Sequence, residues 1–185
     1  MKIKIIKDEI IYEGRFFRTI KRHYIDTNGK PNSWDMVQRK TYGRIVAIAA
    51  ITENKELILE KIFRIPCNSY VIELPAGLMD IKGELEETAI RRELLEETGY
   101  VVDKVKLVLE GPFDTGLVND TMAIYLGMNA RLLQKPQLEG SEDIEIIKVP
   151  LEKLIDYISS YQNNEKVDLK VPAIIPFLQK HDLLI

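Results

Sequence analysis

The stretch 84–99 constrains this chain more than any other, because it reads as a helix whose acidic and apolar residues occupy the same side. Six glutamates and two arginines lie in it, and Gly99 stands where a helix commonly ends. At about 100° per residue, Glu97 lies about 40° and Glu96 about 60° from Glu93. The expected helix over 86–98 therefore turns three carboxylates towards its core side. The apolar residues on that side are Ala89, Ile90 and Leu94.

Such a cluster is unfavourable unless something positive lies within it. Like charges on a helix cost a few tenths of a kcal/mol per pair in water, and more as the local dielectric falls. A solvated acidic face is the plain alternative, but the overlap of the two stripes favours a bound cation. Oxygen-only ligands suit a hard divalent ion, Mg²⁺ or Mn²⁺. Gly77 and Gly83 before the helix permit a loop that can aim a backbone carbonyl at the same place.

The remaining pattern is rich in strands. Alternating apolar and polar residues predict strands through the first 25 residues, with a hairpin turn at 26–29. Further strands are expected at 34–40, 45–51, 57–63, 70–74, 105–109, 122–128 and 144–149, and helices at 151–160 and about 172–181. Because strands and helices do not alternate regularly, a doubly wound parallel sheet is disfavoured, and a mixed α/β or α+β sandwich is expected.

Composition excludes several classes of function. The 185 residues suffice for one domain, or one domain with an arm. A net charge of −3 gives no footprint for duplex DNA or an anionic membrane. The single Cys67 and the two histidines exclude an internal disulfide framework and a Cys- or three-His metal site. No apolar run approaches the roughly 20 residues of a membrane span, and the start lacks a signal peptide. We therefore expect a cytoplasmic protein without nucleic-acid or membrane partners.

The segment from Gly77 to Tyr100 resembles the Nudix box, whose pattern is G-x5-E-x7-R-E-U-x-E-E-x-G-U with U apolar. Glu84 and the run Arg92–Tyr100 match this pattern in order. There are two departures. Gly77 precedes Glu84 by six residues instead of five, and Tyr100 stands where an aliphatic residue is usual. The resemblance implies the Nudix α/β/α sandwich around a mixed sheet and an enzyme that cleaves a nucleoside diphosphate linked to another group.

The resemblance extends beyond the box to the ADP-ribose pyrophosphatase branch. Leu74-Pro-Ala-Gly77 and the strand Ile62–Pro66 look like that branch, and the segments 14–16 and 33–39 resemble its small β-rich dimerisation subdomain. We accordingly expect an N-terminal β subdomain at 1–42, a hydrolase domain at 43–185, and a homodimer. The expected reaction is metal-dependent hydrolysis of ADP-ribose to AMP and ribose 5-phosphate.

The resemblance also implies roles for individual residues. Glu93, Glu96 and Glu97 would bind Mg²⁺ or Mn²⁺ with the backbone carbonyl of Ala76. Arg92 would orient a box carboxylate, while Glu84 would be metal-bound through water or structural. Glu142 is the expected general base, with Glu139 as the alternative and an exposed loop acid as the plain interpretation.

Five residues are candidates for substrate binding. Arg64 would bind the diphosphate, Trp34 would stack the adenine with Phe16 as a second ring, and Asp35 and Arg39 would read the base edge. The plain interpretations are a surface arginine for Arg64 and an interface residue for Trp34.

Two alternatives to ADP-ribose hydrolysis remain open from sequence. The branch usually has a proline about 15 residues past the box, where this chain has Thr115-Gly116, so a GDP-sugar or another nucleotide sugar is also a candidate substrate. A non-catalytic nucleotide sensor is disfavoured by the complete carboxylate set.

Overall fold

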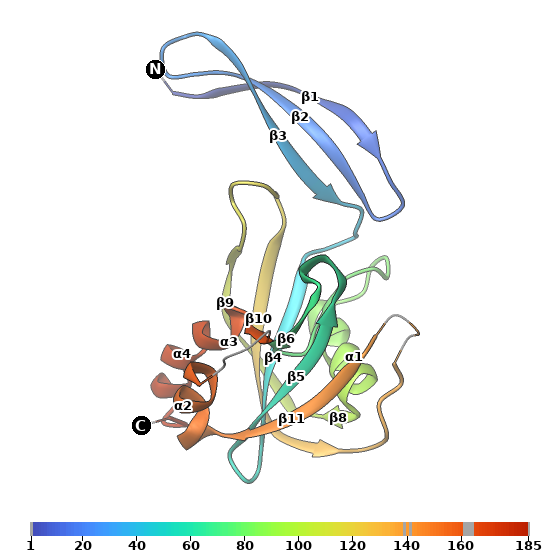
Figure 1. Ribbon diagram of the computed structural model, residues 1–185, viewed down its shortest axis with the longest axis vertical. Coiled ribbons are helices and arrows are strands. Elements are labelled where there is room, and N and C mark those ends of the chain that lie inside the picture. The colour runs from blue at the N-terminus through green and yellow to red at the C-terminus, as the bar shows by residue number, and fades with distance from the viewer. Residues whose placement is uncertain (1, 139, 141, 161–164, 185) are drawn as a thin grey trace.

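The computed structural model describes residues 2–138, 140, 142–160 and 165–184 (Figure 1). The strands are β1 (Lys4–Glu13), β2 (Phe17–Ile25), β3 (Pro31–Arg39), β4 (Ile45–Thr52), β5 (Glu56–Arg64), β6 (Ser69–Glu73), β7 (Ala76–Leu78), β8 (Tyr100–Val101), β9 (Lys104–Pro112), β10 (Thr121–Leu132), β11 (Ile144–Pro150) and β12 (Glu165–Val167). The helices are α1 (Glu86–Thr98), α2 (Leu154–Ser159), α3 (Lys170–Ala173) and α4 (Ile175–Lys180), with 3₁₀ turns at Ile65–Cys67 and Leu151–Lys153.

The body of the molecule is built on a mixed sheet. Its main path runs β12-β6-β5-β4-β10-β8, with β11 beside β5, β7 beside β4 and β9 beside β10. The pairs β4–β10 and β6–β12 are parallel, and the other pairs of this sheet are antiparallel. The expected α/β class with a mixed sheet is confirmed.

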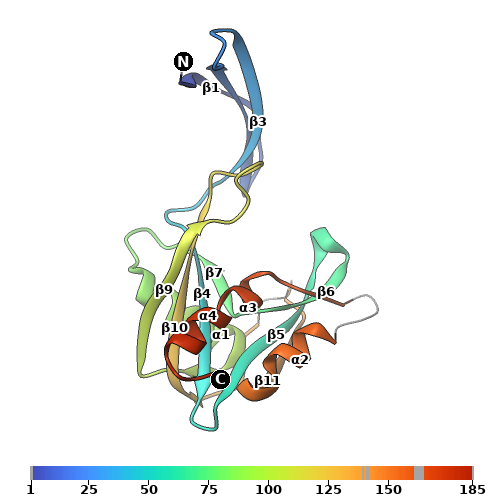
Figure 2. The same cartoon turned by 90° about the vertical axis from the view of Figure 1, so that its left-hand side faces the viewer.

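Strand β4 is buried on both faces, which explains its continuous apolar sequence. Its odd-numbered residues Ala47, Ala49 and Ile51 belong to a core closed by helices α2, α3 and α4. Val46, Ile48 and Ala50, on the other face, belong to a second core closed by α1. Figures 1 and 2 show α1 and the C-terminal helices on opposite sides of the sheet. The expected sandwich of helices around a sheet is therefore present.

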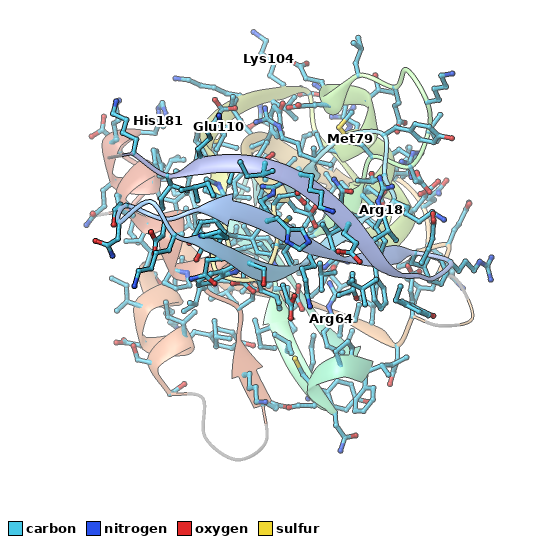
Figure 3. The ribbon with its side chains drawn as sticks, turned by 90° about the horizontal axis from the view of Figure 1, so that it is seen from above. Arg18, Arg64, Met79, Lys104, Glu110 and His181 are labelled. Atoms are coloured by element: carbon cyan, nitrogen blue, oxygen red, sulfur yellow. The ribbon has the colours of Figure 1, made fainter. Side chains whose placement is uncertain are left out.

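The first three strands form a separate antiparallel sheet in the order β1-β2-β3, which stands above the body (Figure 1). It touches the body through the loop between β9 and β10. The Val37 N–H donates to the Leu117 carbonyl at 2.8 Å, and Trp34 Nε1–H donates to the Gly116 carbonyl at 2.9 Å. Viewed from above, these strands lie across the body (Figure 3).

The expected elements agree with the structure except near the C-terminus. The helix expected over 86–98 is α1. The strands predicted in the body are present, most of them with longer ends, and the one expected at 70–74 is β6, shifted by one residue. The helix expected over 172–181 is instead two short helices. Pro176, at the start of α4, cannot donate the hydrogen bond that would join them. The short strands β7, β8 and β12 were not predicted. Within the described residues, no helix is long and apolar enough to cross a membrane.

Candidate active site

Two glutamates of helix α1 lie against the first two residues of β7. The Ala76 N–H donates to Glu97 Oε2 at 3.1 Å. A Cβ atom built on Gly77 would lie 2.0 Å from Glu93 Cδ, so only glycine admits the Glu93 side chain here. Leu85 provides no side-chain cap, and Gly99 ends the helix in the left-handed conformation (φ 75°). Gly77 therefore allows the Glu93 carboxylate to pack directly against the backbone of β7.

Burial and repulsion from nearby carboxylates perturb both of these carboxyl groups. Burial, opposed by the neighbouring Arg92, raises the pKa of Glu93 to about 7. Burial, followed by the charge of Glu93, raises the pKa of Glu97 to about 8, and the charge of Glu142 acts in the same direction. The pKa of Glu60, from β5, lies well above its usual range because of burial and the nearby charge of Glu97. Positive charge placed among these groups would be stabilised.

Arg92 connects the other box carboxylates. Its guanidinium binds Glu84 through Nε to Oε1 and Nη2 to Oε2, both at 3.0 Å. Its Nη1 lies 3.1 Å from Glu93 Oε1 and donates to Glu96 Oε2 at 3.1 Å. This arrangement matches an orienting role for Arg92 and uses both oxygens of Glu84.

The residues present fit a divalent cation in chemical type. The buried Oε1 of Glu60 has no hydrogen-bond partner, and Glu93 and Glu97 both face Ala76 and Gly77 at the start of β7. Glu96 lies further out, with its side chain 45% exposed. In the described part of the chain, no three His, Cys, Asp or Glu side chains converge as a finished metal shell. Glu93, Glu97 and, further out, Glu96 would be the carboxylates available to hold such an ion beside the Ala76 carbonyl.

A cleft of about 770 Å³ opens beside these carboxylates, and Ala76 and Gly77 form part of its wall. Arg64, labelled in Figure 3, and Arg39 also line it. Arg64 binds both oxygens of Glu73, with Nε to Oε1 at 2.7 Å and Nη2 to Oε2 at 3.0 Å. The cleft thus brings two arginines and the carboxylate loop together.

The other substrate candidates lie away from this cleft. Trp34 lines a second cavity of about 370 Å³ beneath the loop 115–119. Asp35 is exposed and lies 4.0 Å from Lys21. Phe16 precedes β2, whereas Trp34 pairs with Arg22, six residues or about 20 Å further along the sheet. One base cannot be stacked between these two rings within a single chain.

The structure locates one of the two candidate general bases. Glu142 is half-buried before β11, and its charge reaches Glu97. Glu139 lies outside the described residues.

Three residues near the site escaped the sequence analysis. Glu60 and Glu73 occupy directly opposed positions on β5 and β6, and Lys170 Nζ donates to Glu73 Oε2 at 3.2 Å. An acid at the end of the apolar run Leu57-Ile-Leu-Glu60 was the available signal. Lys170 gave no signal, because its approach depends on the path of the C-terminal segment.

Comparison with known proteins places this geometry in a family. The family model for the NUDIX domain matches residues 41–168. The ADP-ribose pyrophosphatase of Saccharomyces cerevisiae is 37% identical over 82% of this chain and 71% of its own length. The ADP-ribose pyrophosphatase of Bacillus subtilis is 29% identical over 98% of this chain and 95% of its own.

A solved structure supports the fold. The crystal structure of an ADP compounds hydrolase has a TM-score of 0.80 and 20% identity, covering 100% of this chain and 98% of the other. The match to the family model spans β7, α1 and most of the residues that line the cleft described above. The chain belongs to the NUDIX domain family and is a Nudix hydrolase.

Proposed function

We propose that this enzyme hydrolyses the diphosphate of a nucleoside diphosphate sugar, with ADP-ribose as the substrate and AMP and ribose 5-phosphate as products. The observation that carries the proposal is that Ala76 and Gly77, which Glu97 and Glu93 contact, line a cleft that also contains Arg64 and Arg39. The related ADP-ribose pyrophosphatases support the choice of substrate.

We assign metal binding to Glu93, Glu96, Glu97 and the Ala76 carbonyl, with Mg²⁺ or Mn²⁺ as the ion. A bound divalent ion neutralises non-bridging phosphate oxygens and promotes ionisation of water in such reactions. In this chain, Arg92 holds Glu93 and Glu96 in place, while the Ala76 N–H holds Glu97.

Glu142 is the proposed general base. Water attacks phosphorus, its proton passes to the Glu142 carboxylate, and the bond to the bridging oxygen breaks to release a phosphate ester. Glu142→Gln should lower kcat by about 10²- to 10⁴-fold. Glu145→Gln, an exposed change on β11, is the matched control. Equal turnover of the two variants would transfer the role to another group.

Arg64 is proposed to bind the diphosphate, because a guanidinium at the cleft wall can exchange part of its pairing with Glu73 for phosphate oxygens. Arg39, which lines the same cleft, is proposed to contact the base bound in the cleft of its own chain. Trp34, Asp35 and Phe16 lie too far from the cleft of their own chain, so we assign them to the cleft of a second copy.

We therefore propose a homodimer that shares its two sites. Strand β1 is exposed throughout and leaves one edge of its sheet unpaired. The large apolar side chains exposed on this sheet are Ile3, Ile5, Ile6, Ile10, Ile11, Tyr12, Phe16, Phe17 and Trp34. A second copy would cover this surface.

The substrate assignment is tested by incubating the protein with ADP-ribose or GDP-mannose and Mg²⁺, followed by chromatographic identification of the products. We expect AMP and ribose 5-phosphate from ADP-ribose, with no turnover in EDTA. Faster cleavage of GDP-mannose would favour the GDP-sugar alternative. Tight binding of ADP-ribose without cleavage would indicate a sensor and overturn the proposal.

A further inference from the structure

Glu60 is a carboxyl group in the interior of the sheet. It lies on β5 between β11 and β6, opposite Ile146 on one side and Glu73 on the other, and is only 1% exposed. Strand alternation puts Glu60 on the same face as Ile58, which packs beneath α1. Burying a carboxyl group among apolar residues costs several kcal/mol unless its oxygens are satisfied.

The two opposed glutamates differ in their partners. Glu73 is bound by both nitrogens of the Arg64 fork and by Lys170. Glu60 faces α1 and lies close enough to Glu97 for that carboxyl to raise its pKa, and its Oε1 is buried without a hydrogen-bond partner. The β5 strand therefore presents a carboxyl group to the rear of Glu97.

Glu97 is thus held from two directions. The Ala76 N–H of β7 donates to its Oε2, and the Glu60 carboxyl of β5 lies near it on the face of the sheet that α1 covers. Groups that hydrogen-bond to a metal ligand fix its orientation and commonly change metal affinity about 10- to 100-fold when removed. Resting on the metal site of the proposed function, we infer that Glu60 is a positioning residue that orients Glu97 for binding a divalent cation.

The test measures Mn²⁺ affinity of the full-length protein by electron paramagnetic resonance of free Mn²⁺. Glu60→Gln keeps the shape of the side chain and can donate an amide N–H to Glu97. The Kd of this variant for Mn²⁺ should therefore stay within about threefold of the wild-type value. Glu60→Leu removes the polar group near Glu97 and should raise Kd about 10- to 100-fold. Ile62→Leu, a buried change on the same face of β5, should leave Kd unchanged.

The melting temperature provides a second readout, because it should stay unchanged or rise in the variant whose Mn²⁺ binding weakens. Without metal, Glu60→Leu should melt at the same temperature as wild type or higher, because it removes a buried polar atom without a partner. A residue that serves only packing would not combine retained stability with weakened Mn²⁺ binding. Glu60→Met, unbranched and similar in length, serves the same test if the leucine does not fit.

Two outcomes would overturn the inference. Wild-type affinity in the folded apolar variants would make Glu60 irrelevant to the metal. Equal losses in Glu60→Gln and Glu60→Leu would make Glu60 a direct ligand. Failure of the wild-type protein itself to bind Mn²⁺ would instead remove the metal site of the proposed function, so the two failures are distinguishable.

Discussion

The N-terminal sheet and the body differ in how far their apolar side chains are exposed to solvent. In the body, β4 has helices over both faces, and the residues Val46–Ile51 are at most 1% exposed. In the N-terminal sheet, Ile20 and Met36 are buried, while β1 is exposed along its whole length. The body encloses its own core, whereas the sheet presents apolar area that only another surface can cover.

The same contrast separates the two halves of the site. The carboxylates of α1 are fixed by contacts within the body, such as Gly77 against Glu93. Trp34 and Phe16 lie on the exposed sheet, outside the cleft of their own chain. Substitutions that impair catalysis should therefore act only in the body that contains the site. Substitutions that impair base recognition should act from the N-terminal sheet of the other copy as well.

The largest expected effect is on turnover in the body. Glu97→Gln removes the charge of a proposed metal ligand and should lower kcat by several orders of magnitude, with the fold intact. The matched control is Glu87→Gln, an exposed change on the same helix. Steady-state kinetics with ADP-ribose and circular dichroism check both points. Near-normal turnover of Glu97→Gln would refute the metal assignment.

The next prediction tests the contrast between body and N-terminal sheet through the free energy of unfolding. Leu94→Ala in the α1 core should cost about 2–5 kcal/mol of unfolding free energy at any protein concentration. Ile11→Ala on β1, at 53% exposure, should cost under about 0.5 kcal/mol in the isolated chain and act mainly by weakening the dimer. Urea denaturation at two protein concentrations separates these behaviours, and sedimentation as a fully active monomer would contradict the shared-site dimer.

A smaller effect is expected on base recognition. Trp34→Ala should remove stacking worth about 1–3 kcal/mol and raise KM for ADP-ribose roughly 5- to 150-fold, with less change in kcat. Tyr42→Ala, another exposed aromatic change, should leave KM unaltered. An unchanged KM in Trp34→Ala for every substrate would return this residue to a packing role.

Mixing two defective chains sharpens this prediction. In a dimer formed from one Trp34→Ala chain and one Glu97→Gln chain, one site combines intact carboxylates with an intact tryptophan. Coexpressed chains should therefore recover a site of wild-type KM. Persistence of the raised KM in the mixture would place Trp34 in the site of its own chain.

The smallest expected effect is a pH dependence of the metal-free body. Because the pKa values of Glu93 and Glu97 are raised to about 7 and about 8, the folded state holds more protons than the unfolded state above pH 4.5. Stability should consequently fall as pH rises from about 5 to about 8.5, by several degrees in Tm. Mg²⁺ should restore more stability at the upper end, since it binds the ionised groups. Melting scans in EDTA and in Mg²⁺ check the slope; a rise with pH in EDTA would contradict it.

Local patterns were enough to predict much of this molecule. The 86–98 helix follows from the glutamate spacing and Gly99, and the two-faced strand follows from the apolar run 45–51. Contacts between distant segments were not predictable in this way. The pairing of Lys170 with Glu73, and the approach of Glu60 to Glu97, depend on how separate elements pack. The distance of Trp34 from the cleft likewise depends on where the first sheet rests, which alternation along a strand does not specify.

The parallel pairing of β4 with β10 also affects the order of folding. Ile45 lies beside Met122 in this pair, so the centre of the sheet joins segments separated by much of the chain. Contacts of such long sequence separation slow folding, because a large loop must close before they form. During synthesis, the apolar β4 emerges well before β10. Until then it can pair only with β5 and β7, and its edge for β10 stays open, whereas β1–β3 form all their pairs through short hairpins at once. Aggregation during expression should therefore begin from the 45–51 segment, and slower synthesis or chaperone supply should raise the soluble yield.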